Sequence, residues 1–89
     1  MIGQAIVHYS GILVLVDPSG IDQAAQALET LPGVEVHYLY PDSGRIIAVQ
    51  ETDTAEAQQD GLRRIQAVDG VHMAALVEHR IDQDSKGDD

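Results

Sequence analysis

The chain contains no cysteine, phenylalanine or tryptophan, and it has few basic residues. Without cysteine it can form neither disulfides nor thiolate metal sites, and cysteine catalysis is excluded. Because three Tyr are its only aromatic residues, the core of this 89-residue chain must be aliphatic. No apolar run approaches the ~20 residues that a membrane span needs, and no basic residue precedes the first apolar stretch, as a signal peptide would require. The composition therefore predicts one small cytoplasmic domain without a membrane span.

Charge of one sign dominates the chain. Five Lys and Arg stand against fifteen Asp and Glu, and the first basic residue is Arg45. Such a surface repels phosphate backbones, so nucleic acid is not expected as a partner. It would attract a cationic segment and speed the encounter. The plainer interpretation is that the acidic residues keep the protein soluble.

Strand and helix patterns alternate along the chain in the order βαββαβ. Strands are predicted over residues 5–16, 34–40, 45–51 and 71–81, which are rich in β-branched and aliphatic residues. Between them, apolar residues recur at helical spacing from Ile21 to Leu31, and a second, weaker apolar face is expected from Leu62, Ile65 and Val68. Ser19 and Asp53 are the expected starts of these two helices, because each has an acidic residue three positions later.

Two pairs of similar segments, YSGILVLV with DSGRIIAV and LPGVEV with VDGVHM, divide the chain into two strand–helix–strand halves. Such halves interlock as a ferredoxin-like sandwich of the α+β class. The expected sheet has four antiparallel strands in the order 4-1-3-2, with both helices on one face. We expect a single domain over residues 5–81 and a disordered acidic tail over residues 82–89.

Alternation along the strands predicts which side chains lie on the open face of this sheet. Polar Gln50 indicates the outward face of the third strand. The outward apolar residues are then expected to be Leu13, Leu15, Leu39, Ile46, Ala48, Ala74 and Leu76, and the outward polar ones Glu35, His37, His72 and Glu78. A bulge near Gly11 would swap the faces of the first strand.

An uncovered apolar patch of this kind marks an interaction site, either for a second copy or for a foreign partner. It suits an apolar or amphipathic helix with basic residues at one end.

The sequence contains no clear pattern for metal binding, nucleophilic catalysis or phosphate binding. The four histidines are His8, His37, His72 and His79. They fall on three expected strands without close ligand spacing, so no metal site is expected, and His8 with His79 is expected to form a cross-strand pair. No serine has a base at a recognisable spacing, and no glycine-rich phosphate motif occurs. We therefore expect no catalytic residues, no cofactor and no enzyme.

Three segments together resemble the NapD family over about residues 8–80. They are YSGILVLVDPSGID…LETLPGVEV, the PDSGRIIAVQE hairpin and RIQAVDGVHMAALVEH, in this order and spacing. NapD-type proteins are small cytoplasmic chaperones for the catalytic subunit of periplasmic nitrate reductase. They bind the twin-arginine signal peptide of this client and hold back its export until the molybdenum cofactor is inserted. One departure is Glu78, where the family often has Tyr before the final His.

The resemblance implies that the partner is this signal peptide, which has two adjacent arginines followed by an apolar stretch. Acidic side chains would take the arginines by charge-assisted hydrogen bonds, and the aliphatic face would take the apolar stretch. From strand parity, not from the family, the expected apolar contacts are Leu13, Leu15, Ile46, Ala48 and Leu76, and the expected arginine contacts are Glu35, Glu51 and Glu78.

Two other interpretations remain open at this point. Regulatory small-molecule domains of the ACT type share the βαββαβ plan and the GV segments after the helices, although the DPSGID loop lacks a clear glycine-rich ligand cradle. A structural module whose open sheet face pairs in a weak homodimer is the third interpretation. Sedimentation of the free protein would separate that case from the others.

Overall fold

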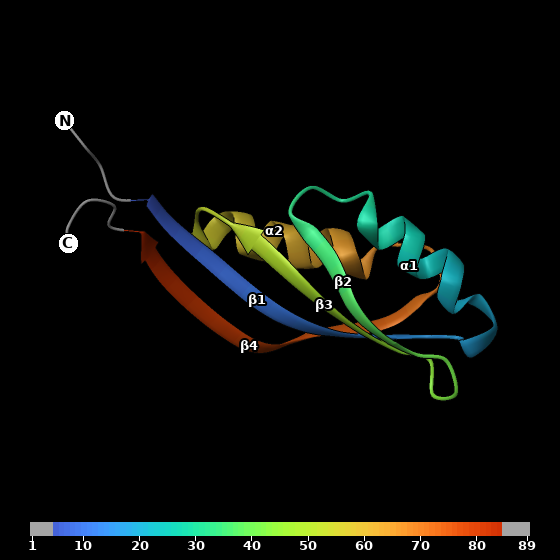
Figure 1. The fold of residues 1–89 in the computed structure, drawn as a ribbon. Coiled ribbons are helices and arrows are strands. Elements are labelled where there is room, and N and C mark those ends of the chain that lie inside the picture. The colour runs from blue at the N-terminus through green and yellow to red at the C-terminus, as the bar shows by residue number, and fades with distance from the viewer. Residues whose placement is uncertain (1–4, 85–89) are drawn as a thin grey trace.

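The computed structural model describes residues 5–84 and shows the predicted order of elements (Figure 1). The elements are β1 Ala5–Val16, the 3-10 turn η1 Pro18–Gly20, α1 Ile21–Glu29, β2 Val34–Tyr40, β3 Arg45–Thr52, α2 Ala55–Gln66 and β4 Val71–Asp84. The strands form one antiparallel sheet in the order β2-β3-β1-β4, and both helices cover the same face of it. This arrangement confirms the predicted ferredoxin-like fold and strand order. Within the described residues, no helix is long and apolar enough to cross a membrane.

The starts of the helices differ slightly from prediction. The Asp17 carboxylate accepts hydrogen bonds from the backbone N–H and the hydroxyl of Ser19, at 3.0 and 2.9 Å. These bonds, the backbone one first, lower the pKa of the Asp17 carboxyl. The predicted cap at Ser19 is wrong, because Ser19 is itself capped by Asp17 at the start of η1. In α2 the cap is Thr54, whose hydroxyl accepts from the Ala57 N–H at 2.9 Å, one residue after the predicted Asp53.

The core lies between the sheet and the helices and is aliphatic, as the composition predicts. Its fully buried apolar residues are Ile12, Val14, Leu28, Ile46, Ala48 and Ile65. In α2, Ile65 is fully buried, and Leu62 and Val68 pack partly buried beside the core, which confirms the predicted apolar face. Burial of each large aliphatic side chain contributes about 1.5–3 kcal/mol. This layer therefore stabilises the packing of the two helices on one face of the sheet.

A bulge in β4 changes the face of its residues. Gly11 pairs with Glu78 and Ile12 pairs with Leu76, so Val77 is an extra residue between the two pairs. Residues directly opposite in an antiparallel pair lie on the same face. Leu76 therefore lies on the helix side with Ile12, and Glu78 lies on the open side with Gly11.

Strand β4 has a second bulge, with His72 as the extra residue between the pairs Leu15–Met73 and Val16–Val71. A third bulge lies in β2. Val36 pairs with Ala48 and Tyr38 pairs with Ile47, so His37 is the extra residue. The alternation beyond it is shifted by one position, which reverses the face of each following residue.

Strand β4 also runs further than predicted. It continues past Ile81 to Asp84, which pairs with Ala5, so β1 and β4 extend as a two-stranded ribbon at one end of the sheet (Figure 1). Residues 82–84, which were expected in a disordered tail, therefore belong to β4. Residues 85–89 lie outside the described residues.

Candidate functional site

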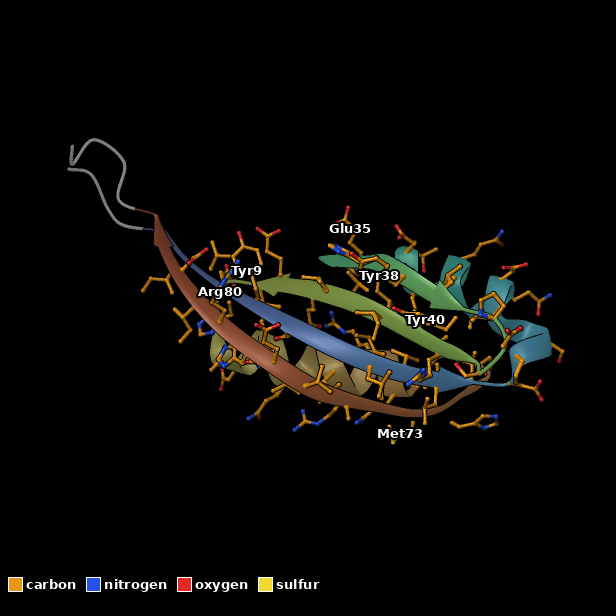
Figure 2. All side chains as sticks on the ribbon, turned by 60° about the horizontal axis from the view of Figure 1, so that its bottom comes forward. Tyr9, Glu35, Tyr38, Tyr40, Met73 and Arg80 are labelled. Atoms are coloured by element: carbon orange, nitrogen blue, oxygen red, sulfur yellow. The ribbon has the colours of Figure 1, made fainter. Side chains whose placement is uncertain are left out.

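On the face of the sheet opposite the helices (Figure 2), side chains from neighbouring strands lie in cross-strand rows. Read from β2 to β4, the register gives one row of Glu51, Tyr9 and Arg80, a second of Glu35, Val49, Gly11 and Glu78, a third of Tyr38, Ile47, Leu13 and Ala75, and a fourth of Tyr40, Arg45, Leu15 and Met73. We call the first two rows the acidic end and the last two rows the apolar end. The open face therefore has a polarity along the strands.

The apolar end exposes large side chains from both outer strands. Tyr38, Tyr40 and Met73 are 60, 45 and 41% exposed. Between them, on the central strands, Leu13, Leu15 and Ile47 are half-buried. Apolar surface that continues across all four strands is typical of an interaction site.

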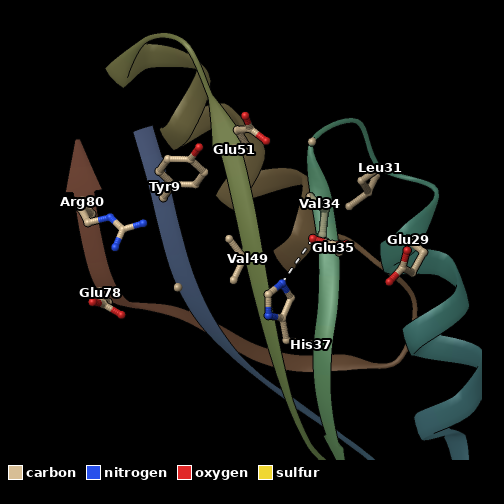
Figure 3. Close-up of a pocket in the computed structure, with 12 residues that line it drawn as sticks. Tyr9, Glu29, Leu31, Val34, Glu35, His37, Val49, Glu51, Glu78 and Arg80 are labelled. Atoms are coloured by element: carbon tan, nitrogen blue, oxygen red, sulfur yellow. Dashed lines mark hydrogen bonds and ion pairs between the residues drawn. The ribbon is translucent and has the colours of Figure 1, made fainter. Parts of the chain in front are cut away.

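The acidic end is hollowed to a volume of about 690 Å³ (Figure 3). Gly11 and Val49 lie on the central strands, and the carboxylates of Glu35, Glu51 and Glu78 lie around them. The missing side chain at residue 11 helps to keep the hollow open, because a Cβ there would lie 3.3 Å from the Glu78 Cβ. Arg80 also lines the hollow, but the carboxylates outnumber it, so the hollow favours a cationic ligand.

These carboxylates have few partners of their own. Glu35 Oε1 lies 3.3 Å from His37 Nε2, and the Glu35 side chain remains 74% exposed (Figure 3). Within residues 5–84, neither Glu51 nor Glu78 forms an ion pair. The nearby Arg80 guanidinium lies 5.3 Å from the centre of the Tyr9 ring. Glutamates this exposed and this little paired can accept charge-assisted hydrogen bonds from an incoming guanidinium.

The predicted placement of Ile46 and Ala48 on the open face is wrong. Both are 0% exposed and lie in the core. The error comes from Gln50, which is not outward but 1% exposed on the helix side. Its amide Nε2 donates to the Gln58 carbonyl at 3.1 Å, and Gly61 of α2 provides the space for it, because a Cβ there would overlap the Gln50 amide.

The bulges correct three further placements. Leu76 pairs with Ile12 and Leu39 pairs with Ile46, so both lie on the helix side, although their positions on outer strands leave them 41 and 39% exposed. Ala74 is buried opposite Val14. In each case the residue expected outward lies on the core side.

The remaining placements agree with the sequence, except that His37 and His72 are the extra residues of bulges. Leu13 and Leu15 of β1 lie on the open face, and so do Glu35, Glu51 and Glu78. The open-face residues that the sequence missed are Tyr38, Tyr40, Ile47, Val49, Met73 and Ala75. Gly61 was the one usable signal, because a glycine inside a helix often marks close packing against a neighbouring side chain.

The predicted histidine pair is present on the helix side of the β1–β4 ribbon. His8 Nδ1 lies 3.1 Å from His79 Nε2, and the two rings stack with centroids 5.3 Å apart. Among the residues that the structure describes, no group of three or more potential metal ligands occurs.

Fold and site together define a small ferredoxin-like α+β protein with one uncovered sheet face, acidic at one end and apolar at the other. A family model described as NapD protein matches residues 7–83. The chain belongs to the NapD family, which confirms the resemblance seen in the sequence. This membership places it with chaperones.

The solved structures that are similar to this chain include two from different protein families. The solution structure of the E. coli Tat proofreading chaperone protein NapD matches with a TM-score of 0.78 and 26% identity, over 83% of this chain and 78% of that chain. A transcriptional regulatory protein of the AsnC family from Pyrococcus furiosus matches with a TM-score of 0.59 and 20% identity, over 91% of this chain and 55% of that chain. The second match shows the fold alone. A comparison with curated proteins found no match.

Proposed function

We propose that this protein is a cytoplasmic chaperone that binds the twin-arginine signal peptide of the catalytic subunit of periplasmic nitrate reductase. By holding the peptide it delays export until the molybdenum cofactor has been inserted. Membership of the NapD family and the similarity to a Tat proofreading chaperone support this proposal. The observation that carries it is the open sheet face, whose acidic and apolar ends match the two parts of such a peptide.

The two ends would bind by different forces. The carboxylates of Glu35, Glu51 and Glu78 would accept charge-assisted hydrogen bonds from the arginines. The apolar stretch would lie over Leu13, Leu15 and their neighbours, at a gain of roughly 25 cal/mol for each Å² of apolar surface removed from water. Ile47 takes the place of the buried Ile46 in this set of contacts.

Binding of this kind explains how export would be held back. A peptide whose arginines and apolar stretch both lie against the sheet cannot present either feature to another partner at the same time. Release then requires only that the peptide dissociates, because no covalent step is involved.

Leu15→Glu tests the proposal directly. Leu15 lies in the last row of the apolar end and is half-buried, so a carboxylate there would have to lose its water against the apolar ligand. We expect this variant to bind a twin-arginine peptide at least about tenfold more weakly in fluorescence anisotropy, a loss of roughly 1.4 kcal/mol. Gln26→Glu, on the exposed surface of α1, is the control for the added charge. Binding by folded Leu15→Glu that is as tight as that of the wild type would refute the proposed site.

The similarity to the AsnC-family regulator does not support small-molecule binding by an ACT-like domain, since a match at 20% identity shows the fold alone. A homodimer that covers the open face would appear as a sedimentation coefficient that rises with protein concentration. Added peptide would abolish that rise if both occupants use the same face.

A further inference from the structure

The second row of the open face carries one carboxylate on each outer strand. Glu35 is paired with Val49, Val49 with Gly11, and Gly11 with Glu78. Neighbouring strands lie about 4.8 Å apart, so the two outer backbones of the row are roughly 14 Å apart. Between the two glutamates are only a valine and a glycine, and all four residues line the hollow (Figure 3).

We propose that Glu35 and Glu78 are two separate anchors, each for one of two adjacent arginines, so that the face selects an arginine pair over a single arginine. This inference rests on the proposed function, because it concerns how the same peptide is held. A segment that lies over the central strands is about 7 Å from each outer strand. An arginine from the segment and a glutamate from the sheet can bridge this distance on each side.

The geometry of a peptide fits two anchors better than one. Consecutive side chains diverge by about 100° in a helix and by about 180° in an extended segment, so adjacent arginines point to different sides. Each guanidinium can then meet its own carboxylate through two parallel N–H···O bonds, which lysine cannot form.

The opposite end of the face determines the direction of the peptide. Arg45 lies in the fourth row, opposite Leu15, with its guanidinium 5.5 Å from the centre of the Tyr40 ring. The acidic end holds one arginine too, Arg80, but there three glutamates outnumber it. A cationic peptide end is therefore attracted to the Glu35–Glu78 row and repelled by Arg45, so the apolar stretch runs toward Arg45. From Gly11 to Leu15 the face is about 13 Å long, which matches roughly nine residues of a helix.

Peptides with one arginine removed at a time distinguish two anchors from a general negative surface. The probes are synthetic signal peptides that carry Arg-Arg, Ala-Arg, Arg-Ala, Lys-Lys or Ala-Ala at the twin positions, titrated by fluorescence anisotropy. We expect Glu35→Gln and Glu78→Gln each to weaken Arg-Arg binding about tenfold. Toward the single-arginine peptides we expect a cross-pattern, in which each variant leaves one of the two unaffected. Glu56→Gln, on α2, controls for the lost charge.

The outcomes separate the two levels of the proposal. Equal losses toward both single-arginine peptides, or a loss with only one of the two glutamates, would overturn the two-anchor inference and leave the proposed function intact. Wild-type protein that binds Arg-Arg no better than Ala-Ala would refute the proposed function, and this inference with it.

A spin label on the peptide tests the direction. A label placed after the apolar stretch should broaden the amide signals of Leu15 and Met73, and a label before the arginines should broaden that of Gly11. In Arg45→Glu we expect the label after the apolar stretch to broaden signals at both ends of the face. The reverse pattern in the wild type would overturn the proposed direction.

Discussion

Two adjacent isoleucines, Ile46 and Ile47, allow the two faces of the sheet to be tested by the same substitution. Ile46 is fully buried against the helices, whereas Ile47 is half-buried on the open face. We expect Ile46→Ala to reduce stability without changing peptide affinity in the folded protein. We expect Ile47→Ala to reduce peptide affinity with little loss of stability.

The expected stability changes follow from burial. Truncation of a fully buried isoleucine to alanine costs about 2–5 kcal/mol, because it removes transfer free energy and leaves a cavity. A domain of this size is stable by roughly 5–15 kcal/mol, so Ile46→Ala takes away a large part of the total. For the half-buried Ile47 the expected cost is about 1–2 kcal/mol, since part of the side chain already meets water and no closed cavity forms.

The expected affinity change can be estimated in the same way. The substitution removes three carbon atoms, each worth about 0.8 kcal/mol when fully buried. At most about a third of the Ile47 side chain remains to be buried by a ligand, so its loss should cost at most roughly 0.9 kcal/mol, or about fourfold in Kd.

Urea unfolding and peptide titration provide the two measurements. The midpoint of unfolding should fall strongly for Ile46→Ala and slightly for Ile47→Ala, with an unchanged slope in both. If Ile46→Ala does not fold, Ile46→Val serves instead, at an expected cost of about 0.5–1.5 kcal/mol. The assignment of faces would be refuted if Ile47→Ala were the more destabilising of the two alanine variants, or if a folded Ile46 variant lost more affinity than Ile47→Ala.

Three further predictions concern the framework. Gly61→Ala should destabilise the fold by about 1–3 kcal/mol despite alanine's higher helix propensity, because the new Cβ overlaps the Gln50 amide; urea unfolding should show recovery in the Gln50→Ala background, and no recovery would contradict this cause. Gly44→Ala should cost at least about 1 kcal/mol in thermal unfolding, because Gly44 has a φ of 72° and a Cβ would overlap a backbone carbonyl of β1; an unchanged midpoint would count against the turn geometry. Asp17→Ala should be less stable than the wild type at neutral pH, because ionised Asp17 accepts the bonds from Ser19. Its carboxyl pKa is lowered in the fold, so this difference should be full above the ordinary carboxyl pKa of about 3.9 and disappear as pH falls through the lower folded value; a difference that persists at pH 2 would exclude the carboxylate as its source.

The sequence predicts the architecture well because the signals for it are local and periodic. The four strand patterns, the two helical patterns and their right-handed connections determine the strand order without reference to any side-chain contact. Strand β1 was also assigned to the correct faces, because its buried residues Ile12, Val14 and Val16 alternate regularly. The positions of the element ends are predicted less accurately. Asp17 rather than Ser19 is the cap that precedes the first helix, and β4 continues to Asp84.

The site was predicted only in part, because the assignment of faces depends on single positions. As a polar residue, Gln50 is expected to point outward. It is instead buried beside Gly61, so the predicted faces of all β3 residues are reversed. The extra residue His37 shifted the faces of β2 by one position, and the extra residues His72 and Val77 shifted the faces of the part of β4 between them. A run of apolar residues contains no sequence signal for a bulge of this kind. In contrast, Gly61 inside α2 is a local signal for the buried Gln50 amide.

The most direct test of the account is an NMR titration of the protein with a twin-arginine signal peptide and with a version in which both arginines are alanine. We expect the twin-arginine peptide to shift the signals of Gly11, Leu13, Leu15 and Ile47, and to leave the signals of Ile46 and Ile65 nearly in place. The alanine version should bind more weakly at the same residues, since it keeps the apolar contacts and loses the carboxylate anchors. Absence of shifts with either peptide, or shifts confined to the helices, would contradict the claim that the open sheet face binds the signal peptide.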